Sequence, residues 1–107
     1  MGLKKLATGT VTTGAGSVAY TVPTGMECNV VDIMISNHSA NQAGINIYFV
    51  PVGGTVGVSN AFLPHFHIAS HEIYHWVGNQ KLNTGDFIHV ISDQSDVAMH
   101  ITGDETR

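Results

Sequence analysis

Charged side chains are scarce in this chain and unevenly distributed along it. They make up 11% of its 107 residues, against about 25% in an average globular domain. Between Leu6 and Gln80 there is no lysine or arginine, and there are only three acidic residues. Solubility normally depends on such charges, so Thr, Ser, Asn and Gly must replace them here, or a neighbouring protein must cover the surface. Because no basic stripe exists, the sequence predicts no binding to nucleic acid.

Cysteines and long apolar segments are also scarce. The single cysteine, Cys28, excludes an internal disulfide and favours folding in a reducing cytoplasm. No apolar run approaches the roughly 20 residues that cross a membrane. The first residues also lack the apolar stretch of a signal peptide. The sequence therefore predicts a cytoplasmically made protein without membrane contact.

Apolar and polar residues alternate with a period of two along most of the chain, which indicates β-strands. Turn-forming residues separate these segments, and none has a helical period. We predict one all-β domain, an antiparallel β-sandwich of about eight strands, jelly-roll-like or Ig-like. An N-terminal arm (1–8) precedes the domain (9–102), and a loose charged tail (103–107) follows it. The predicted strands are residues 10–13, 17–22, 26–36, 43–50, 61–68, 73–77, 87–91 and 97–102, with residues 78–80 in a turn.

The same alternation predicts which side chains fill the core. In the longest predicted strand, Val31, Ile33 and Ile35 share one face, and Asp32 and Ser36 lie on the other. The full predicted core consists of Val31, Ile33, Ile35, Ile45, Ile47, Phe49, Phe66, Ile68, Phe87 and Val90. Residues 87–91 are apolar on both faces, so the inward-facing set in that strand stays open.

Three segments follow one another in a recognisable order. They are YTVPTG at residues 20–25, before a long apolar strand, YFVPVGGT at 48–55, and LNTGD at 82–86. This ordered set resembles the small β-sandwich structural proteins of tailed bacteriophage virions. Those proteins often carry a Y-x-V-P-x-G segment, a Y-x-V-P-x-G-G loop and a P-G-D turn. Asn83 stands here where the family usually has proline.

The resemblance implies a structural role in a virion and no catalytic activity. Capsid decoration is the favoured role, as a homotrimer that binds the major capsid protein on the outer surface of the shell after synthesis in the host cytoplasm. A place in the neck, tail or baseplate is the alternative. A cement protein needs neutral contact surfaces, since burying few charges costs little desolvation, and closed symmetric oligomers are the general expectation.

Contacts with neighbouring proteins are predicted in the arm at residues 1–8, in the charge-free loop at residues 51–60 and at two pairs of side chains. The predicted interface residues are Pro51, Val52, Gly53, Gly54, Thr55, Val56, His65, His67, Tyr74 and Trp76. Tyr74 and Trp76 alternate with Ile73 and Val77, which places the two aromatic rings on one face. That aromatic face either meets a neighbour or fills the core.

Four of the seven histidines fall between residues 65 and 75. On an extended strand His65 and His67 project from the same face, and such a pair can hold a transition metal. One interpretation is a trimer in which His65 and His67 of each chain bind a shared metal on the three-fold axis. Another is a surface pair without metal, in which Phe66 and Ile68 face the core and the imidazoles lie at a subunit contact. In this second interpretation the protein binds no metal and has no cofactor.

A third interpretation is a small metal-binding cupin enzyme. His65, His67 and Glu72 have the spacing of the first cupin motif, and His100 could take the place of the histidine in the second. Such a protein holds Fe, Mn, Ni or Zn inside its β-barrel. Gly78 lies near the glycine that closes the first motif. The match is incomplete, because only a few residues separate Gly78 from Gly85, where cupins place another hairpin.

Overall fold

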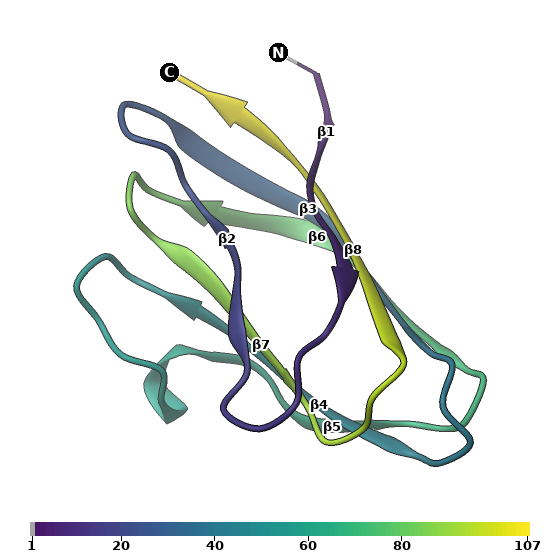
Figure 1. Ribbon diagram of the computed structural model, residues 1–107. Helices are drawn as coiled ribbons and strands as arrows, with labels where there is room; N and C mark the ends of the chain where they lie inside the picture. Colours follow the sequence, from purple (N-terminus) through teal and green to yellow (C-terminus); the bar gives the residue numbers. More distant parts are fainter. Residues whose placement is uncertain (1) are drawn as a thin grey trace.

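The computed structural model describes residues 2–107, and most of these residues are in β-strands (Figure 1). Two predicted strands, at residues 43–50 and 61–68, have the predicted bounds, and the others differ at one or both ends. The strands are β1 (Lys4–Thr10), β2 (Ser17–Thr21), β3 (Glu27–Asn37), β4 (Ala43–Val50), β5 (Ala61–Ile68), β6 (Ile73–Leu82), β7 (Phe87–Ser92) and β8 (Val97–Thr106). A short 3₁₀ helix, η1 (Val58–Asn60), precedes β5.

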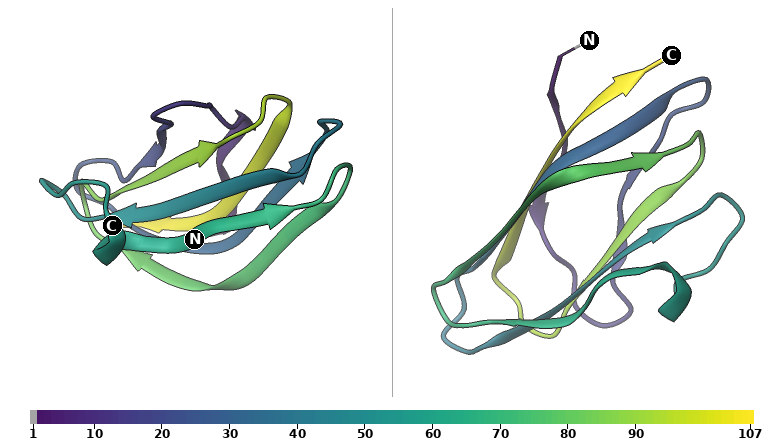
Figure 2. Two further views of the ribbon diagram at one scale, coloured as in Figure 1. Left: turned by 90° about the horizontal axis from the view of Figure 1, so that it is seen from below. Right: turned by 180° about the vertical axis from the view of Figure 1, so that it is seen from behind.

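Two four-stranded antiparallel sheets form the sandwich predicted from the sequence (Figure 2). One, here called sheet A, has the order β1-β8-β3-β6, and the other, sheet B, has the order β2-β7-β4-β5. The first strand therefore pairs with the last, the second with the seventh, the third with the sixth and the fourth with the fifth. A chain folded back on itself as one long hairpin and then wrapped into two sheets gives this order, which is that of a jelly roll.

Isoleucine and valine side chains from both sheets fill the space between them. Six predicted core residues are buried, namely Ile33, Ile35, Ile45, Ile47, Ile68 and Val90. Phe49 is partly buried and packs against this core. The core thus forms where alternation along regular strands places apolar side chains on the inner faces.

Val31 is not in the core, and the prediction for it was wrong. The pairing of β3 with both of its neighbours shifts register between Val30 and Asp32. Relative to β8, β3 has one extra residue here, Val31. This is a β-bulge, which reverses the alternation of the side chains. Cys28 and Val30 are therefore buried before the bulge and Ile33 after it. Two residues of β6, Gly78 and Asn79, lie opposite Val31, and residues 78–80 continue the strand instead of forming the predicted turn.

Phe66 and Phe87 were also predicted to be core residues, and neither is buried. Phe66 lies after the bend at His65 (φ 37°), opposite the buried Ile45, and is 43% exposed at the sheet edge that β5 forms. In β7 the inward-facing residues are Ile88 and Val90, which leaves Phe87 half-buried at the strand's start.

Both segments predicted to lie outside the sandwich belong to its sheets. Residues 4–8 of the predicted arm are in β1, where Lys4 pairs with Gly103 of β8. The predicted loose tail continues β8, and Thr106 pairs with Glu27 of β3. Most of the predicted strand at 10–13 lies in the connection to β2. Met1, also assigned to the arm, is outside the described residues.

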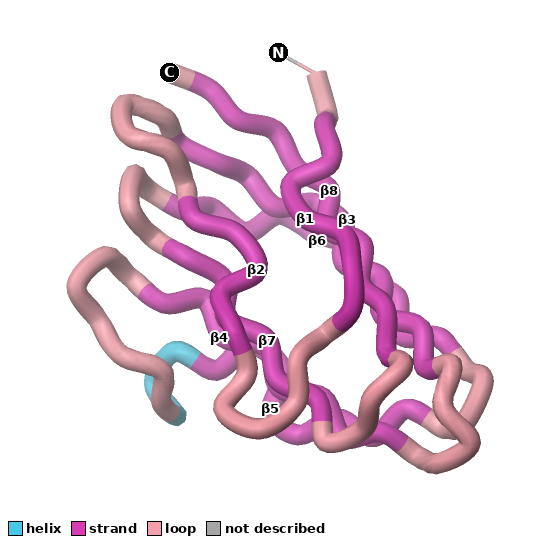
Figure 3. The backbone as a smooth tube through the Cα atoms, in the orientation of Figure 1, coloured by secondary structure: helices cyan, strands magenta, loops and turns pink. Residues whose placement is uncertain are grey.

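The connections lie at the two ends of the sandwich (Figure 3). The β2–β3, β4–β5 and β6–β7 connections lie at one end, on the left in Figure 1. The β3–β4 and β5–β6 connections lie at the opposite end, at the lower right. All three segments that resemble phage virion proteins reach the first of these ends.

Candidate interaction surface

Backbone and carboxylate hydrogen bonds join the three motif segments to one another. The Val22 N–H donates to the Asp86 carbonyl (2.9 Å), and the Gly85 N–H donates to the Val22 carbonyl (3.1 Å). The Asp86 carboxylate accepts from the N–H groups of Val52 (2.9 Å) and Asn83 (2.8 Å). Asp86 thus closes its own turn and also holds the start of the β4–β5 loop, a role that sequence reasoning missed although it had identified the turn.

Gly85 meets two requirements at this junction. Its φ is +85°, a conformation that side-chain-bearing residues rarely adopt. A Cβ atom there would also lie 2.7 Å from a methyl group of Val52. The glycine of the LNTGD segment therefore allows the turn and the loop to approach each other.

The loop at residues 51–60 contains hydrogen bonds of its own. The Gly54 N–H donates to the Pro51 carbonyl (2.8 Å), and the Asn60 side-chain amide donates to the Thr55 carbonyl (2.7 Å). Together with η1 and the bond to Asp86, these contacts give the loop a defined shape. The loop can therefore present the same side chains to a partner each time.

Three valines of this loop face solvent. Val58 is 94% exposed, Val52 66% and Val56 38%, and no residue of the loop is charged. Exposed apolar side chains grouped on a neutral loop are typical of a contact surface for another protein. The predicted interface at Pro51, Val52, Gly53, Gly54, Thr55 and Val56 therefore has the exposure that a contact requires, and its use stays a prediction.

The histidines His65 and His67 lie beside each other on the exposed part of β5. Their ring centroids are 4.9 Å apart. The His65 N–H donates to the Asn46 side-chain oxygen (2.6 Å), which holds the bend in β5. A Cβ at Gly44 would lie 2.4 Å from the His65 ring, so the absence of a side chain on β4 makes room for this imidazole.

The residues of the cupin interpretation are not brought together. His65 and His67 are exposed on sheet B, Glu72 is in the exposed β5–β6 turn, and His100 is exposed on sheet A, where its Nδ1 lies 3.2 Å from Thr8 Oγ1. Among residues 2–107 no three His, Cys, Asp or Glu side chains are grouped so that they could hold a metal. A metal shared by His65 and His67 of several chains stays a prediction.

Tyr74 and Trp76 lie between the edge strands of the two sheets. The Phe62 and Trp76 ring centroids are 5.0 Å apart, and so are those of Phe66 and Tyr74. Both β6 aromatic rings are half-buried against the core. Tyr74 and Trp76 therefore fill the edge of the core, which is one of the two alternatives predicted for the pair. Phe66 packs against Tyr74 although it is itself partly exposed.

The outer face of sheet A carries the residues that alternate with this aromatic pair. Ile73 and Val77 are 61% and 69% exposed. Between them, His75 Nε2 lies 2.8 Å from Asp32 Oδ2. A shallow, mainly apolar depression beside them is lined by Leu3, Val31, Asp32, Met34, Val77, His100 and Thr102.

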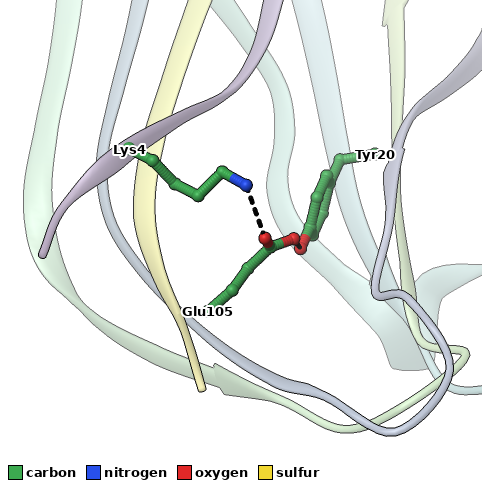
Figure 4. Close-up of polar contacts among 3 residues, drawn as sticks. All are labelled: Lys4, Tyr20 and Glu105. Carbon is green, nitrogen blue, oxygen red and sulfur yellow. Dashed lines mark hydrogen bonds and ion pairs between the residues drawn. The ribbon is translucent and has the colours of Figure 1, made fainter. Parts of the chain in front are cut away.

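A buried carboxylate connects the two ends of the chain to sheet B (Figure 4). Glu105 of β8 is 7% exposed, accepts a hydrogen bond from Lys4 Nζ at 2.7 Å and accepts another from the Tyr20 hydroxyl. These two bonds hold the pKa of Glu105 below its ordinary value, while burial raises the pKa of Tyr20. This cluster is structural, and no local sequence signal indicated it, because its members are far apart along the chain.

No protein-family model, curated protein or solved structure matches this chain. Among residues 2–107 there is no helix with the length and apolar character needed to span a membrane. The interpretation of the surfaces described above therefore depends on their own chemistry.

Proposed function

We propose that this protein is a non-enzymatic structural subunit of a tailed-phage virion. Its favoured place is the outer surface of the capsid, where it binds the major capsid protein as a homotrimer and stabilises the shell. The support is the ordered set of three sequence segments together with the jelly-roll fold. The scarcity of charge between Leu6 and Gln80 supports the same role, since a surface with few charges can be covered by a neighbour at low desolvation cost.

One observation carries most of this proposal. The three segments that resemble virion proteins meet at one end of the sandwich, where Asp86 and Gly85 hold the 51–60 loop. That loop presents three exposed valines and no charge. A segment set that builds one neutral, apolar, well-defined surface is suited to docking on a protein shell.

Particles purified from cells that express this chain from its native genome provide the test. Mass spectrometry should find the chain in the particles, and a cryo-electron microscopy map should place it on the shell. A copy number close to that of the major capsid protein supports decoration, whereas a much lower number supports the neck, tail or baseplate. Purified particles that lack the chain would contradict a virion role.

A matched pair of variants tests the loop itself. Val58→Asp places a charge at the most exposed valine of the 51–60 loop and should reduce the occupancy of the protein on particles at least tenfold. Ser95→Asp adds the same charge in the exposed β7–β8 turn at the other end of the sandwich and should leave occupancy unchanged. Equal occupancy of the two variants would mean that the loop is not the docking surface.

A further inference from the structure

Four strands form the edges of the two sheets, and three of them have features that prevent pairing with another chain. β5 contains Pro64 and bends at His65. β1 carries Lys4 and Lys5 and shifts register after them. β2 has only five residues and also shifts register. Edges modified in this way are poor templates for a further strand.

The first half of β6, residues 73–77, is an edge without such features. It contains no lysine, arginine, acidic residue or proline, and its pairing with β3 is regular over these residues. In an antiparallel ladder, every second residue turns its N–H and C=O groups away from the neighbouring strand. At a sheet edge those groups are available to pair with a strand of another molecule.

The side chains of this segment are symmetrical in chemistry about His75. Ile73 and Val77 are both β-branched, and Tyr74 and Trp76 are both aromatic. When two copies run antiparallel with His75 opposite His75, Ile73 of one faces Val77 of the other on the outer side. Tyr74 likewise faces Trp76 on the inner side. Aromatic and β-branched cross-strand pairs stabilise sheets. A two-fold axis at Trp76 would instead pair unlike residues, His75 with Val77 and Tyr74 with Gly78.

Charges near the segment are compatible with this register. Lys81, the one basic residue of β6, lies outside residues 73–77 and is held by Glu27 at 2.9 Å. Glu72 of one copy falls opposite Gly78 of the other, which has no side chain. His75 lies beside Asp32 of its own chain at 2.8 Å. No two acids or two lysines face each other across the contact.

We propose that residues 73–77 of β6 pair antiparallel with the same residues of a second copy, about a two-fold axis at His75. The pairing joins sheet A of two molecules into one continuous sheet, and Ile73 and Val77 become covered. Such an isologous contact is the commonest type in homo-oligomers. It does not depend on the proposed place in a virion, and it can coexist with a three-fold contact elsewhere on the molecule.

Sedimentation of the purified chain over a wide concentration range tests the stoichiometry. A two-fold contact requires an even number of chains, a dimer or, with a three-fold contact, a hexamer. A contact limited to one strand pair is smaller than a standard interface of about 1,600 Å², so the association should be reversible. Val77→Lys should halve the mass of the oligomer, and Val18→Lys, at a 51% exposed valine of the edge strand β2, should leave it unchanged. Monomers or trimers at every concentration, or an unchanged mass for Val77→Lys, would overturn the proposal.

Cysteine substitution tests the register separately. The native Cys28 is buried, so a new surface cysteine is the reactive one. Directly opposed residues have Cβ atoms about 4.5–5.5 Å apart, so His75→Cys should form a covalent dimer on mild oxidation or with a short thiol cross-linker. Val77→Cys lies opposite Ile73, about 13 Å along the strand from its own counterpart, and should cross-link at least tenfold less. Equal cross-linking of both variants, or none at residue 75, would overturn the register.

Discussion

At the scale of single residues, Asn37 does the most to organise the end of the sandwich opposite the 51–60 loop. It is buried at the end of β3, and its amide donates to the carbonyl oxygens of Asn41 (2.8 Å) and Ile68 (3.0 Å). Its side-chain oxygen accepts hydrogen bonds from the backbone N–H and the hydroxyl of Ser39. One side chain thereby connects the β3–β4 loop to the end of β5.

Replacing Asn37 should therefore destabilise the fold. Asn37→Ala removes the acceptor of the buried Ser39 N–H and the donor to the Ile68 carbonyl, and each unsatisfied buried group costs about 1–3 kcal/mol. We expect the free energy of unfolding, measured by urea titration, to fall by at least about 2 kcal/mol. Asn41→Ala, at an exposed position in the same loop, should change it by less than about 0.5 kcal/mol. A similar small change for both variants would contradict this role of Asn37.

The Glu105 carboxylate gives the protein a defined response to acid. Its pKa is lowered from about 4.5 by the Lys4 bond first and the Tyr20 bond second, against the opposing effect of burial. A lowered folded-state pKa contributes stability that is present above the ordinary value and is lost as the pH falls below it. We expect the free energy of unfolding to decrease as the pH falls below about 4.5.

Glu105→Gln removes this titrating group and should flatten that decrease, while it lowers the free energy of unfolding near pH 7. The measurement is urea unfolding at a series of pH values. Glu72→Gln, in the exposed β5–β6 turn, serves as the control and should keep the pH dependence of the native chain. An unchanged slope in Glu105→Gln would show that other groups cause the acid response.

At the scale of elements, strand positions followed from the sequence more reliably than strand faces. The bounds of β4 and β5 and the inward set of β4 were predictable from alternation and turn residues. The face was predicted wrongly where the bulge in β3 reverses the alternation, as at Val31. Phe66 has the predicted inward face, opposite Ile45, but is partly exposed at the sheet edge. A bulge has no local sequence signal of its own, because it depends on the register of the neighbouring strands.

The bend in β5 depends on a glycine of the neighbouring strand. Gly44→Ala would place a Cβ 2.4 Å from the His65 ring and 2.9 Å from the Asp93 carboxylate. Overpacking of this kind costs about 1–3 kcal/mol, which should appear as a lower free energy of unfolding. Gly57→Ala is the control, since its Cβ would have no neighbour within 4 Å and its φ is −176°. If both alanine variants were equally stable, Gly44 would have no role in seating His65.

At the scale of the whole molecule, protection of the sheet edges and scarcity of charge act together. Three edges carry bulges, lysines, a proline or a short strand, and residues 73–77 of β6 carry none of these. Most of the exposed large apolar residues among residues 2–107 lie on that edge, on the adjoining face of sheet A and on the 51–60 loop, and Val18 of β2 and Phe66 of β5 lie elsewhere. This distribution supports the two separate contact regions proposed above, the 51–60 loop and residues 73–77 of β6.

The sequence by itself determined the class of fold, because an alternation of period two is a local property that turn residues divide into strands. It also determined the scarcity of charge and the charge-free loop, which composition alone defines. Tertiary structure decided the jelly-roll order, the inclusion of both chain ends in the sheets, the burial of Glu105 and the meeting of the three motif segments at Asp86. These features depend on pairing between residues far apart along the chain, and local patterns carry no information about such pairing.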